Sequence, residues 1–177
     1  MNLVIQPLPT NGPLFEGAIR VYGEAFALPP YSDPDRGMEV RARMRDVHRI
    51  RAGFQAYAAV ERDGSVVGMI YGYRGARGQW WHDMVRDALP AASARQWLDS
   101  SYELVEVAVS PACQGQGIGT ALIEALLRDR EEATCVLSTR ADSQAHHLYA
   151  RLGFEVITEM PFSPGGALFY VMGKRLC

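Results

Sequence analysis

The amino-acid sequence predicts an α/β fold in which a mixed, mostly antiparallel sheet is flanked by helices. Residues 102–139 have the pattern of a strand, a glycine-rich turn, an amphipathic helix and a second strand, which is the order of a crossover between parallel strands. Residues 54–73 have the pattern of two strands joined by Asp63-Gly64, a strong signal for an antiparallel hairpin. A chain of 177 residues, 48% of them hydrophobic and 21% charged, has the composition of a globular protein, and we expect residues 1–177 to form one domain.

Hydrophobic spacing, together with the positions of proline and glycine, predicts the remaining elements and gives about seven strands in all. Further strands are expected over residues 3–8, 154–160 and 168–175. Helices are expected over residues 13–27, from residue 33 through the next apolar-spaced stretch, from the glycine-rich turn to Glu132, and over 143–152. The interval 74–101 is expected to be irregular apart from a short helix over 93–98.

Charge and composition exclude several classes of function. The formal net charge is −2, so no positive field attracts nucleic acid or an anionic membrane, and neither partner is expected. Three cysteines, odd in number and far apart, predict neither a disulfide framework nor a metal site, and a cytoplasmic location is expected. The arginine-rich helix after residue 33 carries a local excess of positive charge, which we interpret as a solvated face in preference to a grip on an acidic ligand.

The glycine-rich turn over residues 114–119 is expected to hold a phosphate group, because the start of a helix presents unpaired N–H groups and a positive dipole. A P-loop requires a lysine after the last glycine, but Lys174 is the only lysine in the chain. A dinucleotide fingerprint fails in both frames, which end on Thr120 and Leu122. The remaining pattern is Q/R-x-x-G-x-G/A, supplied by Gln114, Gly117 and Gly119.

This loop and a second segment resemble the GNAT superfamily of acyl-CoA-dependent N-acetyltransferases. The loop follows a turn that reads Val109-Ser110-Pro111, and residues 142–154, DSQAHHLYARLGF, are similar to the family's NxxAxxLYxxxGF signature. The resemblance implies a GNAT-like fold with a splayed parallel strand pair, and acetyl-CoA as acyl donor. It also implies that Tyr149 is a general acid for the departing thiolate. The donor-binding residues implied are Val107, Ala108, Val109, Gln114, Gly115, Gln116, Gly117, Ile118, Gly119 and Thr120.

Two glutamates of the strand before the loop are candidates for the general base. Glu103 and Glu106 lie in apolar surroundings, which raise a carboxyl pKa toward the range of a useful base. They are three residues apart, so they face opposite sides of a regular strand. GNAT-like enzymes place an acidic residue at either position, and we retain both, with Glu103 slightly ahead.

The acceptor is expected to be a primary amine of a small molecule or peptide, which receives the acetyl group directly in a ternary complex. Tyr22, Phe26, Tyr31 and Trp81 are plausible lining of its site. Trp81 and its neighbour Trp80 are interpreted equally well as a lid over a pocket or as a small satellite core. The alternative function is a non-catalytic acyl-CoA-binding regulatory module. A homodimer is possible, because dimers are common in the family.

Overall fold

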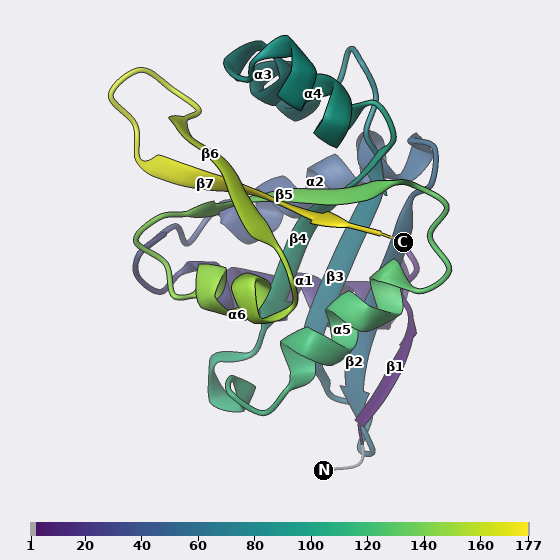
Figure 1. Cartoon of the computed structure of the whole chain (residues 1–177). Helices are drawn as coiled ribbons and strands as arrows, with labels where there is room; N and C mark the ends of the chain where they lie inside the picture. Colours follow the sequence, from purple (N-terminus) through teal and green to yellow (C-terminus); the bar gives the residue numbers. More distant parts are fainter. Residues whose placement is uncertain (1–2, 177) are drawn as a thin grey trace. The chain divides into compact units, whose positions relative to one another are not determined.

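The computed structural model describes residues 3–176 and contains seven strands and six α-helices in that range (Figure 1). The strands are β1 (Leu3–Pro7), β2 (Gln55–Glu61), β3 (Val66–Arg74), β4 (Ser101–Val109), β5 (Thr134–Arg140), β6 (Glu155–Pro161) and β7 (Leu168–Arg175). The helices are α1 (Gly12–Phe26), α2 (Arg36–Asp46), α3 (Trp80–Ala88), α4 (Ala91–Leu98), α5 (Ile118–Leu127) and α6 (Ala145–Arg151). Two short 3-10 turns, η1 (His48–Ile50) and η2 (Pro111–Cys113), follow α2 and β4.

The strands form one mixed sheet in the order β1-β2-β3-β4-β5-β7-β6, which confirms the predicted fold class. The pairs β1/β2, β2/β3, β5/β7 and β6/β7 are antiparallel, and β4/β5 is parallel, as the strand-helix-strand pattern required. The parallel ladder joins Ser101 to Thr134, Tyr102 to Cys135 and Glu103 to Val136, all at the beginning of β4.

The chain divides into two compact units, and the division falls inside β4 between Leu104 and Val105. In the described range, the first unit comprises residues 3–73 and 105–128, and the second comprises residues 74–104 and 129–176. The predicted glycine loop and Glu106 therefore belong to the first unit, whereas Glu103 and Tyr149 belong to the second.

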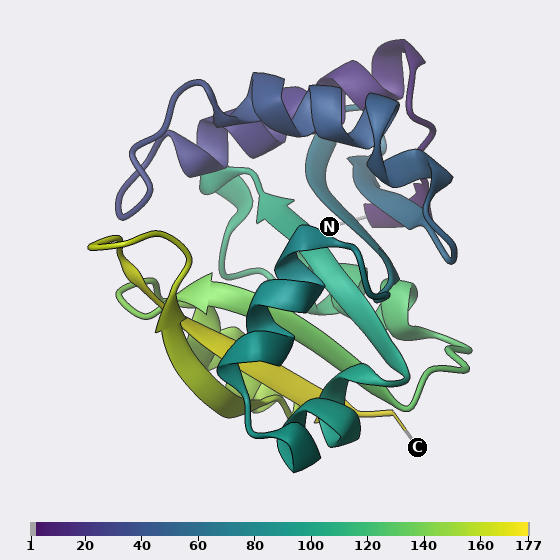
Figure 2. The same cartoon turned by 90° about the horizontal axis from the view of Figure 1, so that it is seen from above.

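In the first unit, α1 and α2 run side by side over the sheet strands (Figure 2). Val40 and Met44 recur at helical spacing on α2 and are fully buried, so this face of the helix packs inward. The two helices cross closely, because a Cβ atom built on Gly37 would lie 3.2 Å from the Cα atom of Gly23. On the other face, α5 packs against β3 at Gly68, where an added Cβ would lie 3.0 Å from the Leu122 side chain.

In the second unit, α3 and α4 cover one face of the β5-β7-β6 strands, and α6 lies on the other (Figure 1). Val85 of α3 and Leu98 of α4 pack in one core cluster with Val136 of β5 and Val171 of β7. The two short helices α3 and α4 are thus stabilised by apolar contacts with the sheet, because isolated helices of this length are only marginally stable.

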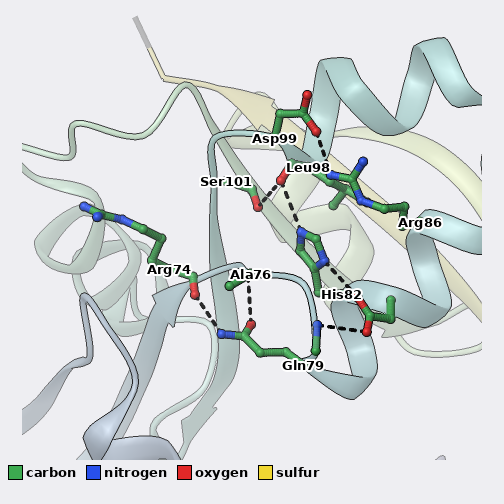
Figure 3. Close-up of polar contacts among 10 residues, drawn as sticks. Arg74, Ala76, Gln79, His82, Arg86, Leu98, Asp99 and Ser101 are labelled. Atoms are coloured by element: carbon green, nitrogen blue, oxygen red, sulfur yellow. Dashed lines mark hydrogen bonds and ion pairs between the residues drawn. The ribbon is translucent and has the colours of Figure 1, made fainter.

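The segment 74–101 is more regular than the sequence predicted, because it contains α3 as well as α4. Hydrogen bonds fix its start and its end (Figure 3). The Gln79 side chain donates to the carbonyl of Arg74 (3.1 Å) and accepts from the N–H of Ala76 (3.2 Å). The buried His82 ring places Nε2 3.2 Å from the carbonyl of Leu98, which joins α3 to α4. The contact between His82 and Leu98 joins residues 16 positions apart, and no local sequence pattern shows it.

The prediction that the helix after the glycine loop reaches Glu132 is wrong. α5 ends at Leu127, Arg128 adopts an extended conformation, and Asp129 has a positive φ of 57°. The residues after Leu127 continue a charged stretch that has no apolar stripe to bury, so helical propensity alone does not extend the helix.

Within residues 3–176, no helix is long and apolar enough to cross a membrane. In the same range, no group of three or more His, Cys, Asp or Glu side chains is arranged to hold a metal ion.

We expect Gly173→Ala to destabilise the protein by about 1–3 kcal/mol through overpacking. Gly173 lies on β7 directly under the Trp97 ring, and an added Cβ would lie 2.7 Å from that ring and 2.6 Å from the Ile157 side chain. Urea unfolding at neutral pH measures the effect. Gly23→Ala is the control, since its Cβ would meet Gly37 at 3.8 Å, an ordinary contact. Equal stability of both variants would contradict the packing described for this unit.

Candidate active site

The loop between β4 and α5 presents backbone N–H groups at the start of a helix. Gly115 and Gly117 have φ values of 76° and 83°, and a Cβ atom on either would meet no atom within 4 Å. The first intrahelical bond of this stretch runs from the N–H of Ala121 to the carbonyl of Gly117 (3.1 Å). The N–H groups of the three residues before Ala121 therefore have no carbonyl within the helix to pair with. Open space, left-handed glycines and a positive helix end together suit a phosphate group.

All ten residues predicted to bind the acyl donor lie in the first unit, on the continuous segment that runs from β4 into α5. The end of β4 is anchored to β3 by the N–H of Ser110, which donates to the carbonyl of Val67 (2.8 Å). The Gln114 side chain donates to the carbonyl of Val109 (3.2 Å), so the loop is tied back to the strand that precedes it. The loop is thereby held at a fixed place at the end of the strand.

Glu106 is a nearly buried carboxylate three residues before the end of β4. Its side chain retains 11% of its exposure, and its Oε1 atom lies 3.7 Å from the Nη2 atom of Arg36. The Arg36 Nε–H donates to the Tyr22 hydroxyl (2.7 Å), and this hydroxyl also acts on the Glu106 carboxylate. Burial raises the pKa of Glu106 above its ordinary value, and the positive charges of Arg36 and Arg43 and the Tyr22 hydroxyl oppose that rise in part. A carboxylate in this setting is a better proton acceptor than an exposed one.

Three of the four residues predicted to line the acceptor site come together around Arg36. The Tyr22 and Phe26 rings are stacked, with centroids 4.3 Å apart, and Tyr31 lies 4.6 Å from Phe26. The guanidinium carbon of Arg36 lies 4.5 Å from the Phe26 centroid and 4.8 Å from that of Tyr31. Each contact of this kind contributes roughly 0.5–2 kcal/mol. The fourth residue, Trp81, is in the second unit.

Trp81 belongs to the core of the second unit. Its indole N–H donates to the Ser138 hydroxyl (2.9 Å), and its ring packs against the cluster beneath α3 and α4. Trp80, in contrast, is 62% exposed and has its ring 5.7 Å from that of Phe162. For Trp81, these contacts favour the satellite-core interpretation over a lid.

Sequence reasoning did not identify His48, a buried histidine that contacts Tyr71 and Tyr73 in the first unit. Its Nδ1 atom is 2.9 Å from the Tyr71 hydroxyl, and its ring packs against the edge of Tyr73. Burial, reinforced by the positive charges of Arg51 and Arg43, lowers the pKa of His48 to about 4. The ring is therefore neutral at neutral pH. The alternating tyrosines of β3 were the one local signal that this face of the strand is polar.

Glu103 lies in the second unit, in a different setting from Glu106. It is 5% exposed and pairs across the parallel ladder with Val136. Its charge acts on Cys135, a fully buried cysteine whose pKa burial raises to about 12. This thiol therefore stays protonated at neutral pH. The glutamate beside it lies in the interior of its unit.

Tyr149 lies on α6 in the second unit and is 6% exposed. Its ring meets that of Phe154 edge to face, with centroids 5.9 Å apart. Its carbonyl accepts from the N–H groups of Leu152 and Phe154, and Gly153 has the positive φ of 90° expected at a helix end. The signature segment therefore forms the predicted helix and turn, with the tyrosine ring held against the residue that follows the turn.

We expect acid to destabilise the fold through His48. The unfolded chain protonates this histidine near pH 6.5 and the folded chain only near pH 4, so the unfolded state binds more protons between these values. The contribution is fully present above pH 6.5 and is lost as pH falls to about 4, by about 3 kcal/mol. Denaturant unfolding at several pH values should show a flatter acid slope in His48→Asn. The exposed His147→Asn is the control, and an unchanged slope in His48→Asn would refute the assignment.

Comparison with known proteins agrees with this geometry. Residues 54–156 match the family described as Acetyltransferase (GNAT) domain. The chain is 34% identical to a GCN5-like protein acetyltransferase of Mycobacterium tuberculosis, over an alignment of 191 residues that covers 90% of each protein.

Solved structures share the fold at lower identity. A protein of Corynebacterium glutamicum described as histone acetyltransferase HPA2 and related acetyltransferase has a TM-score of 0.68, with 21% identity over 100% of this chain and 98% of that one. PaiA N-acetyltransferase of Thermoplasma acidophilum, solved in complex with coenzyme A, has a TM-score of 0.67, with 15% identity over 99% of this chain and 100% of that one. The chain belongs to the GNAT family of acetyltransferases, and acetyl-CoA is its acyl donor.

Proposed function

We propose that this protein is an N-acetyltransferase in which Glu106 is the general base that removes a proton from a primary amine, directly or through water. The observation that carries the proposal is the position of Glu106. It is a buried carboxylate with a raised pKa, on the strand that leads into the phosphate-binding loop and in the same compact unit as that loop. The amine must be neutral to attack a thioester, and a positioned base typically contributes 10²–10⁴-fold in rate.

The donor would bind along the segment from Val107 to Thr120. The N–H groups at the start of α5 would hold the pyrophosphate, and the main chain of Val107 and Val109 would bind the pantetheine arm and the thioester carbonyl. Tyr149 would donate its phenolic proton to the departing thiolate, as its place in the family-like signature implies. Residues 1–177 would function as one acetyltransferase domain.

The acceptor is proposed to be an amine of a peptide or protein before a small molecule. The name of the Mycobacterium tuberculosis relative, a protein acetyltransferase, favours this order. The aromatic side chains of Phe26 and Tyr31 pack against Arg36, which pairs with the proposed base, and these partly exposed rings offer apolar surface to a side chain or peptide. Tyr22, stacked on Phe26, is fully buried and offers no such surface. Transfer would be direct, in a ternary complex, because Cys113, the cysteine nearest the loop, precedes the phosphate-binding residues and would not lie at the thioester. The Cys135 thiol is buried and protonated.

The base assignment is tested with Glu106→Gln, and Glu103→Gln is the matched variant on the same strand. Initial rates are measured by CoA release with a panel of lysine-containing peptides, free N-terminal peptides and small primary amines. We expect Glu106→Gln to lower kcat by about 10²-fold or more while acetyl-CoA binding stays near that of the wild type. Glu103→Gln should retain most of the turnover. The reverse pattern would transfer the role to Glu103, and donor binding without transfer to any amine would favour a non-catalytic acyl-CoA-binding module.

The acid assignment is tested with Tyr149→Phe, which keeps the ring and its packing against Phe154. Turnover should fall strongly, because the thiolate then leaves without a proton donor, while acetyl-CoA affinity by calorimetry stays nearly intact. Unchanged turnover would remove Tyr149 from the mechanism.

A further inference from the structure

Arg36 packs against two neighbouring aromatic rings. It opens α2, and its side chain keeps 25% of its exposure. Its guanidinium carbon lies 4.5 Å from the Phe26 centroid and 4.8 Å from the Tyr31 centroid, and these two centroids are 4.6 Å apart. Phe26 is itself stacked on Tyr22. The cation therefore has little freedom to leave the position that the rings define.

Arg36 has two polar partners, Tyr22 and Glu106. The Nε–H of Arg36 donates to the Tyr22 hydroxyl (2.7 Å), and Nη2 lies 3.7 Å from the Glu106 carboxylate. A tyrosine hydroxyl that accepts one hydrogen bond still has one proton to donate. The Tyr22 hydroxyl favours the ionised form of Glu106, as a proton donor beside that carboxylate does. Arg36 thus acts on Glu106 in two ways, through its charge and through Tyr22.

This arrangement needs the fork of an arginine. The guanidinium presents donors in a rigid plane, so that one can reach Tyr22 while another faces Glu106. A lysine has one ammonium group and keeps the charge without the two fixed directions. The groups that act on Glu106 from the surrounding elements are Arg36 and Arg43 of α2 and Tyr22 of α1. The Glu106 charge in turn helps to raise the pKa of Tyr71 on β3. Arg36 is the charged group among them with an ion-pair distance to the carboxylate.

We propose that Arg36 is a positioning residue, which orients the Glu106 carboxylate through Tyr22 and offsets the cost of its burial. The proposal rests on Glu106 being the base. Loss of the Arg36 charge leaves the burial of Glu106 in place and removes an opposing cation, so the pKa of Glu106 should rise. The base would then be ionised only at higher pH, and turnover at neutral pH would fall.

The direct test follows the Glu106 carboxyl itself and needs no acceptor. Protein labelled with ¹³C at the glutamate carboxyl is titrated by NMR, and the Glu106 signal is identified by its loss in Glu106→Gln. In Arg36→Gln we expect the midpoint of the Glu106 titration to move upward by roughly 1–3 pH units. In Arg36→Lys, which keeps the charge, the midpoint should stay closer to that of the wild type. An unmoved midpoint in Arg36→Gln would overturn the proposal.

Arg41→Gln is the matched control, on the same helix. Arg41 pairs with Glu16 at 2.8 Å on the solvent side, where Glu16 is 52% exposed. This variant should leave the Glu106 midpoint unchanged, which separates a local effect of Arg36 from a general loss of charge on α2. Thermal unfolding of each variant shows whether the fold is kept. Should Arg36→Gln fail to fold, Tyr22→Phe, which removes the bridging hydroxyl alone, is titrated in its place and should also raise the midpoint.

The kinetic consequence separates this proposal from the assignment of the base. With an acceptor from the amine panel, Arg36→Gln should shift the acid limb of kcat/KM upward by the same amount as the NMR midpoint. Millimolar guanidinium should restore part of the lost turnover in Arg36→Ala, whereas Arg41→Ala should keep its turnover with or without guanidinium. If the NMR midpoint moves while the acid limb does not, Arg36 positions Glu106 but Glu106 is not the base. If neither moves, Arg36 has no such role.

Discussion

The burial of one carboxylate, Glu106, is the constraint on which the first unit depends. An ionised carboxylate placed in a protein interior costs roughly several kcal/mol unless a charge and hydrogen bonds oppose the loss of water. Side chains of two helices offset this cost: Tyr22 on α1 and Arg36 on α2. Close packing of α1 against α2 at Gly23 and Gly37 brings both side chains over the same residue of β4. The helix crossing therefore places both partners beside Glu106.

The same strand shows how environment divides two similar residues. Glu103 and Glu106 are both acidic residues of β4, and sequence alone placed Glu103 slightly ahead as the base. In the structure, Glu103 lies in the second unit beside a buried, protonated thiol, whereas Glu106 faces Arg36 and Tyr22. A carboxylate needs a partner that holds it without neutralising it if it is to accept a proton during catalysis. Glu106 has such partners on α1 and α2.

The fold was largely predictable because its strongest signals are local. The Asp63-Gly64 turn, the glycine loop before α5 and Gly153 after α6 each act within a few residues, and the hairpin, the crossover and the final strands appear where these signals placed them. α3 was not predicted because its stability comes from contacts such as that between His82 and Leu98. The excess length given to α5 has a similar origin, since helical propensity does not reveal where burial ends.

For the candidate site, the sequence predicted the types of residue present but not which side chains contact one another. The glycine loop and the aromatic residues of α1 were visible from motif and spacing, yet Arg36 was hidden among the arginines of α2. The interpretation of that helix as a solvated face holds for Arg41, which pairs with an exposed glutamate, and fails for Arg36. Both have the same side chain, and only the packing of α1 beside α2 distinguishes them. His48 was missed for the same reason.

The most direct test of this account compares two titrations of the wild-type protein. The acid limb of kcat/KM reports the pKa of the essential base in the free enzyme, and ¹³C NMR reports the pKa of the Glu106 carboxyl. We expect the two midpoints to coincide above the ordinary value for glutamate, because burial raises the pKa of Glu106. An acid limb at a pH where the Glu106 signal shows a fully ionised carboxylate would contradict the account and assign the base to another group.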